Sequence, residues 1–140
     1  MKKNIFILLL LSTVVFANFT RDNTTGIVTD NSTALQWQDN VEASTTLKDW
    51  TSAINYCETL ILGSYNDWRL PNINELQSLV DDRYINPSVE KSIFQNVAAN
   101  LYWSSTTYVN DFSVVWGISF KYGYEYVNAK SSSSYIRCVR

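Results

Sequence analysis

The sequence contains no histidine, and only two of its 140 residues are cysteine, two are proline and four are glycine. Without histidine a Ser-His-Asp triad cannot form, so Ser104 and Ser105 do not indicate that chemistry. The usual zinc sites take histidine or several cysteines, so we expect no zinc centre. The scarcity of glycine and proline excludes a collagen-like stalk. These absences predict a protein that is not an enzyme, with no catalytic residue.

The first residues are typical of a secretory signal peptide. Two lysines precede a run from Ile5 to Phe16 that is mostly apolar, and Ala17 is a small residue suited to cleavage. The run is shorter than the roughly 20 residues that a membrane-spanning helix needs. We therefore expect residues 1–17 to be removed and residues 18–140 to form one domain that is periplasmic, extracellular or at the cell surface.

The charge balance argues against nucleic acid as a partner. Without the two leader lysines, 9 of the 11 basic residues remain against 13 acidic residues, a net charge of −4. The sequence shows no basic run, whereas nucleic-acid binders normally carry a cationic patch. We expect no membrane span after signal removal, and nothing in the sequence assigns an oligomeric state.

The two cysteines, Cys57 and Cys138, predict a disulfide. Export would place them in an oxidising compartment, and two cysteines allow one intramolecular pairing. Apolar residues recur at helical spacing from Trp50 to Ile61 and place Cys57 on the buried side of a helix. Two buried free thiols are the alternative.

The order of predicted elements is strands, two helices and strands, which indicates an α+β fold with a mostly antiparallel sheet. Asp49 is the expected cap of the first helix, which we expect to stop at Gly63. Asn72 and Glu75 form a capping-box pattern at the start of the second helix. A turn is expected at Tyr122-Gly123, and residues 89–94 suggest a short helical turn. The expected strands are residues 19–21, 27–29, 34–38, 101–106, 114–120, 124–128 and 135–139.

Several motifs stand in a fixed order along the chain. They are Gly26 to Gln38, Trp50 to Cys57, Asp67 to Asn72 with Glu75-Leu76, Tyr102 to Ser105, and Arg137 to Arg140. This ordered set resembles the Lcl C-terminal domain family, a former domain of unknown function named after a collagen-like bacterial adhesin. The resemblance covers nearly all of residues 19–140 and implies a bacterial, adhesin-like protein with a twisted, C-type-lectin-like fold. It also implies that the N- and C-terminal strands lie close together and that a cysteine on the first helix bridges to the last strand.

Several residues of these motifs are interpreted as structural. The Trp-Arg-Leu-Pro segment also resembles one in formylglycine-generating enzymes, which share the broad fold. Those enzymes depend on cysteine chemistry, and a disulfide would occupy both cysteines here. We expect the arginine to bond carbonyls or a carboxylate such as Glu75, although binding an anionic ligand is an alternative. The structural residues are Trp68, Arg69, Leu70, Pro71, Glu75, Trp103 and Ser104.

Calcium is the one metal that the sequence leaves open. Asp81 and Asp82, with Asp67, are candidate oxygen donors. The motifs of familiar calcium-dependent lectins, Glu-Pro-Asn or Gln-Pro-Asp with Trp-Asn-Asp, are not present. We therefore expect no cofactor, with calcium as the alternative.

Four tyrosines are the candidate ligand-binding residues. Tyr122, Tyr124 and Tyr126 alternate, so they would share one face of a regular strand. Together with Tyr108 they would form an aromatic platform for a sugar ring or a protein. The alternative is that Tyr124 and Tyr126 are half-buried sheet residues, with Tyr122 exposed in the turn.

The sequence therefore predicts an exported, non-enzymatic binding domain that recognises a glycan or a surface protein. The resemblance suggests carbohydrates or sulfated polysaccharides, and the negative net charge argues against the sulfated class. The alternatives are an enzyme distantly related to the formylglycine-generating, sulfatase-modifying proteins, and a structural component of a surface assembly.

Overall fold

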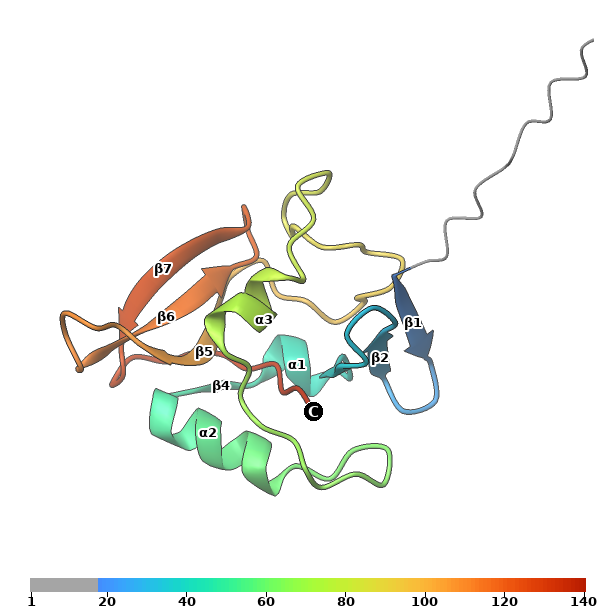
Figure 1. The fold of residues 1–140 in the computed structure, drawn as a ribbon, viewed down its shortest axis with the longest axis horizontal. Coiled ribbons are helices and arrows are strands. Elements are labelled where there is room, and N and C mark those ends of the chain that lie inside the picture. The colour runs from blue at the N-terminus through green and yellow to red at the C-terminus, as the bar shows by residue number, and fades with distance from the viewer. Residues whose placement is uncertain (1–17) are drawn as a thin grey trace, which may run out of the picture.

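The computed structural model describes residues 18–140, so the expected signal peptide lies outside the described residues (Figure 1). Three helices and two sheets make up the described chain, and the predicted α+β class is confirmed. None of the helices within residues 18–140 has the length and apolar character to cross a membrane.

The smaller sheet is antiparallel and contains β1 (Phe19–Asp22), β2 (Ile27–Asp30) and β3 (Gln36–Gln38) in that order. Arg140 and Gln36 exchange two backbone hydrogen bonds of 2.9 Å. The C-terminal end of the chain therefore lies beside β3 of the N-terminal sheet, which agrees with the proximity of the terminal strands that the family resemblance implies.

The larger sheet has the strand order β4-β8-β5-β6-β7, and only the β5–β8 pair is parallel. Its short members lie at one side and its long members at the other, so that β7 is the outermost strand in Figure 1. The five strands are β4 (Leu47–Lys48), β5 (Leu101–Thr107), β6 (Val114–Ser119), β7 (Tyr124–Ala129) and β8 (Ser134–Tyr135).

The two longer helices begin where the sequence predicts. In α2 (Trp50–Thr59) the Asp49 carboxylate accepts a hydrogen bond of 2.9 Å from the Ser52 backbone N–H. In α3 (Ile73–Gln77) both halves of the capping box form. These caps satisfy N–H groups that have no partner within the helix.

Two details differ from the expectation. A short helix, α1 (Glu42–Thr45), precedes β4. Residues 89–94 contain the expected short helical turn, in which the Phe94 N–H donates to the Glu90 carbonyl at 2.8 Å. Helix α2 ends at Thr59 rather than at Gly63, because Leu60 takes an extended conformation. Gly63 lies in the following turn with φ of 62°.

The last expected strand is also shorter, since β8 stops at Tyr135. Val139 instead forms single bridges with Trp37 and with Arg69. Cys138 therefore lies in a buried extended segment between the smaller sheet and the residues before α3, and not in a strand of the larger sheet.

The core has two clusters, one on each face of the larger sheet, because neighbouring strand residues point to opposite faces. Tyr102 belongs to the first cluster and Trp103 to the second, and both are fully buried. The second cluster contains Cys57 and Cys138, which form the predicted disulfide with a Cα–Cα distance of 5.5 Å. The bond joins α2 to a segment 81 residues away.

We expect replacement of both cysteines by alanine to lower the free energy of unfolding by about 2–5 kcal/mol, because the unfolded chain regains the freedom that the long loop closure removes. Urea unfolding of residues 18–140 measures the loss, with Ser133→Ala in an exposed loop as the control. An unchanged midpoint in the double variant would contradict this role for the disulfide.

Candidate functional site

Three of the four candidate tyrosines gather on the β6–β7 hairpin. Tyr124 and Tyr126 are 64% and 49% exposed, and Tyr122 in the turn is 50% exposed. The ring centroids of Tyr122 and Tyr124 lie 6.3 Å apart. The Lys121 ammonium lies 5.1 Å from the centroid of the Tyr122 ring. Tyr124 is therefore more exposed than the half-buried alternative has it, whereas about half of Tyr126 is covered.

A hollow of about 300 Å³ lies beside Tyr126, the one candidate tyrosine among its lining residues. The antiparallel register sets Tyr124 opposite Ser119 and Tyr126 opposite Gly117, so that these pairs share one face of the sheet. A Cβ atom on Gly117 would lie 2.4 Å from the Tyr102 carbonyl oxygen, so only glycine permits β5 to approach here. The residues that line the hollow are Leu101, Ser119, Tyr126, Val127 and Asn128.

Tyr108 does not belong to this group. It follows β5 at the far end of the β5–β6 hairpin, where its ring meets the edge of Trp116 at a centroid distance of 5.3 Å. Its hydroxyl accepts a hydrogen bond of 3.1 Å from the Asn110 amide. Trp116 pairs with Val127, the residue after Tyr126. Because neighbouring strand residues point to opposite faces, Trp116 lies on the face of the sheet away from Tyr126. The aromatic platform consists of Tyr122, Tyr124 and Tyr126 alone.

A second and larger hollow, of about 570 Å³, follows the exposed side of α2. Sequence reasoning missed it, although Thr51, Asn55 and Thr59 recur every fourth residue and thus share one side of the helix. The Tyr56 hydroxyl in this hollow accepts a hydrogen bond of 3.0 Å from the buried Gln38 amide. The lining is polar throughout and consists of Lys48, Thr51, Ser52, Asn55, Tyr56 and Thr59.

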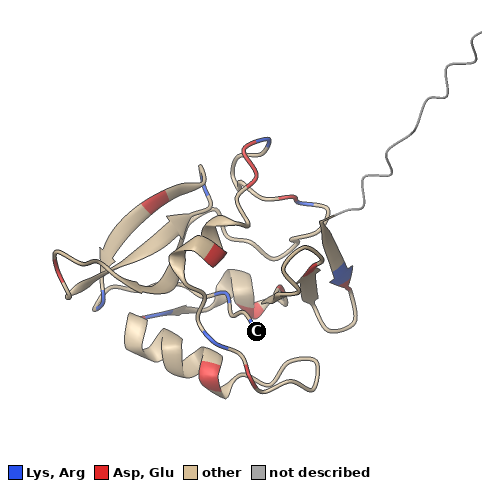
Figure 2. Cartoon of the chain, viewed as in Figure 1, with Lys and Arg blue, Asp and Glu red and all other residues tan. Residues whose placement is uncertain are grey.

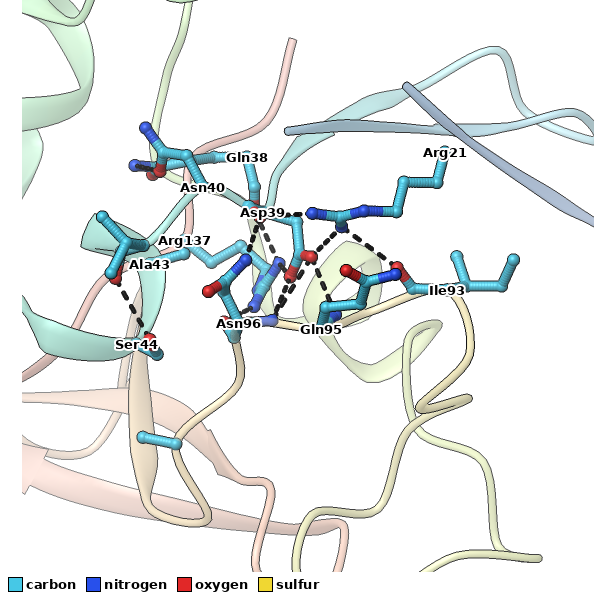
Figure 3. A network of polar contacts seen from close by, with 12 residues as sticks. Arg21, Gln38, Asp39, Asn40, Ala43, Ser44, Ile93, Gln95, Asn96 and Arg137 are labelled. Carbon is cyan, nitrogen blue, oxygen red and sulfur yellow. Dashed lines mark hydrogen bonds and ion pairs between the residues drawn. The ribbon is translucent and has the colours of Figure 1, made fainter. Parts of the chain in front are cut away.

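A buried group of charges surrounds Asp39, whose side chain is fully inaccessible (Figure 3). Its carboxylate accepts a hydrogen bond of 2.8 Å from Arg137, which is also buried, and forms an ion pair with Arg21. The backbone N–H groups of Gln95 and Asn96 complete its shell at 2.8 and 3.3 Å. The carboxylate therefore has two cationic and two backbone partners.

Arg137 makes two further hydrogen bonds. It donates to the Gln38 carbonyl at 2.5 Å and to the Asn96 carbonyl at 2.7 Å, and its guanidinium lies 5.4 Å from the centroid of the Phe94 ring. Neither hollow described above is lined by Asp39 or Arg137. The arrangement holds four segments of the chain together and lies outside both hollows, so we interpret it as structural.

The Trp-Arg-Leu-Pro segment has the contacts of a structural motif. Arg69 donates two parallel hydrogen bonds of 2.7 and 2.8 Å to Glu75. The Arg69 bonds hold the pKa of the Glu75 carboxyl below its usual value. The segment also leads into α3, because Glu75 accepts a bond from the Asn72 backbone N–H. The side chains of Trp68, Leu70 and Pro71 are buried.

The other two motif residues make buried contacts as well. The Trp103 indole N–H donates to the Lys48 carbonyl at 2.8 Å. The Ser104 hydroxyl donates to the Trp116 carbonyl at 2.6 Å. Ser104 therefore connects β5 to β6 where the register between them shifts.

Asp81, a weak calcium candidate, already has a cationic partner. Arg83 donates to both of its oxygens, and these bonds lower the pKa of the Asp81 carboxyl. Asp82 is exposed beside it. Within residues 18–140, no three histidine, cysteine or acidic side chains come together in a way that would hold a metal ion.

The fold and these surfaces together describe a disulfide-linked α+β domain with exposed aromatic residues on an outer strand. The Lcl C-terminal domain model matches residues 26–140 of this chain. The match covers most of the sequence, and the chain belongs to this family. No curated protein matches the chain.

We expect Asp39→Asn to lower the free energy of unfolding by about 3–5 kcal/mol, because Arg21 and Arg137 would keep their charges without a buried anion. Asp67→Asn is the matched control, since Asp67 also pairs with an arginine, Arg140, but is 61% exposed. We expect the control to lose less than about 1 kcal/mol. Urea unfolding measures the free energy of unfolding of both variants. Equal losses in the two variants would contradict a central structural role for the Asp39 carboxylate.

Proposed function

We propose that this chain is an exported, non-enzymatic binding domain that recognises a neutral glycan through Tyr122, Tyr124 and Tyr126. The observation that carries the proposal is the exposure of these three rings on one hairpin, with Tyr126 lining a hollow between that hairpin and β5. Small-ligand sites typically combine apolar and aromatic walls with a few polar groups that fix orientation.

The platform offers both kinds of contact that a sugar uses. The faces of Tyr124 and Tyr126 supply apolar area at a small cost in side-chain entropy. Ser119 brings a hydroxyl to the hollow that can donate and accept hydrogen bonds. The Asn128 amide also lines the hollow, and it donates to the Ser134 hydroxyl and accepts from the Ala129 N–H. A pyranose presents an apolar C–H face and a rim of hydroxyls, which matches this arrangement.

The charge around the platform favours a neutral ligand over a sulfated one. Glu125 lies between Tyr124 and Tyr126 in sequence and is the only charged residue of β7 (Figure 2). Lys121 is the nearest cation, and it lies against the Tyr122 ring. The described chain outside the leader also carries an excess of acidic residues.

Export and the absence of catalysis have separate support. The disulfide suits an oxidising compartment. Residues 18–140 contain no free cysteine, and the sequence has no histidine, so neither a Ser–His nor a Cys–His pair can form. A formylglycine-generating type of enzyme, which needs free thiols, fits this chain less well than a binding domain does.

We expect residues 18–140 to bind neutral glycans on an array, equally with calcium and with a chelator. Tyr124→Ala and Tyr126→Ala should each weaken binding to the best glycan by at least about tenfold in calorimetry, a loss of about 1.4 kcal/mol. Phe112→Ala, which removes an exposed ring from another loop, is the matched control and should leave the affinity unchanged.

Three results would change the assignment. Loss of binding in Asn55→Ala but not in the tyrosine variants would move the site to the hollow along α2. No signal for any glycan would overturn glycan recognition and leave a protein partner or a structural role in a surface assembly. A free thiol detected in the denatured, unreduced protein would contradict the disulfide and would favour the alternative of an enzyme that uses cysteine chemistry.

A further inference from the structure

Strand β7 is a long sheet edge within residues 18–140, and Glu125 is its one charged residue. Exposed edges are commonly guarded by lysine, proline, a bulge or short length. At the opposite edge of the same sheet, β4 has two residues and is flanked by α1 and α2. The edge strand β1 carries Arg21 and Asp22. By contrast, β7 has six residues, contains neither lysine nor proline, and pairs with β6 without a register shift.

The register identifies the free backbone groups of β7. The Lys130 N–H donates to the Ser113 carbonyl at 2.9 Å, in the same register as the β6–β7 pair. Because hydrogen-bonded pairs alternate along an antiparallel ladder, the Tyr126 backbone also bonds to β6, and those of Glu125 and Val127 face outward. The Ala129 N–H is occupied by the Asn128 side chain at 3.0 Å, so the free edge ends there.

We propose that β7 pairs with β7 of a second copy of this chain, antiparallel, about a two-fold axis at Tyr126. In this register Glu125 lies opposite Val127 of the second copy, and Tyr126 lies opposite its own counterpart. The two copies exchange about four backbone hydrogen bonds through Glu125 and Val127.

The two neighbouring registers of a β7–β7 pair are unfavourable, so the edge favours the register centred on Tyr126. A shift of two residues in one direction sets Glu125 directly opposite Glu125 of the second copy, where like charges repel. A shift of two residues in the other direction requires the Ala129 N–H, which Asn128 already occupies. The register centred on Tyr126 avoids both conflicts.

The pairing would join the two larger sheets into one and place Tyr124 and Tyr126 of both copies in one aromatic stripe. It uses the backbone of β7, whereas the proposed glycan contacts use the ring faces. The pairing therefore does not rest on the proposed function, and either proposal can fail without the other.

Sedimentation velocity of residues 18–140, which contain both core clusters and the disulfide, tests the pairing. We expect the dimer fraction to rise between about 10 µM and about 1 mM, the range of weak association. Val127→Pro removes an outward N–H that β6 does not use, so it should abolish the dimer. Val127→Thr keeps that N–H and should preserve it, with circular dichroism confirming the fold of both variants.

A monomer at every concentration would overturn the proposal. A different protein would then be the candidate partner of the β7 edge. A dimer that survives Val127→Pro in a folded protein would overturn it as well, since the contact would then lie elsewhere.

A cysteine at position 126 tests the register. Directly opposed residues of a non-hydrogen-bonded antiparallel pair have Cα atoms about 4.5 Å apart, within the range of a disulfide. Tyr126→Cys should therefore form a covalent dimer on oxidation, and Tyr124→Cys, which would face Asn128 of the second copy, should not. Equal cross-linking of the two variants would overturn the proposed two-fold axis.

Discussion

The ion pairs and hydrogen bonds of Asp39 join the smaller sheet, through β1 and the end of β3, to two segments that lie outside that sheet. Arg21 comes from β1, Asp39 follows β3, Asn96 lies in the long segment before β5, and Arg137 precedes the end of the chain. The long segment from α3 to β5 contains no strand, and the Asp39 contacts are therefore a main fixed point for it. Buried charges are tolerated only when every partner is present, so the network constrains all four segments at once.

The disulfide constrains the same C-terminal segment from its other side. Arg137 and Cys138 are adjacent in sequence, and an extended segment points neighbouring side chains in opposite directions. Arg137 accordingly meets Asp39, while Cys138 meets α2 in the second core cluster. Residues 136–139 are buried without forming a strand, because their polar and covalent contacts replace a ladder.

The sequence predicted the elements that depend on local signals and missed those that depend on long-range contacts. Asp49 and the Asn72–Glu75 capping box located both helix starts, since a cap is decided within four residues. Nothing local distinguishes Asp39 from the other acidic residues, because its partners lie up to 98 positions away. The end of the chain looked like a strand from composition alone, yet its hydrogen bonds go to separate segments.

The alternation of Tyr122, Tyr124 and Tyr126 showed which residues could share a face, but alternation cannot say whether that face is covered. Whether the face is covered depends on the strand order, which makes β7 the edge of the larger sheet. It also depends on the second core cluster, whose sheet residues come from β5 and β6 and not from β7. Tyr108 shows the same limit, since the irregular register between β5 and β6 places it against Trp116. Burial by the second cluster therefore stops one strand short of the edge. That boundary leaves two tyrosine rings and an unpaired strand exposed at the same place.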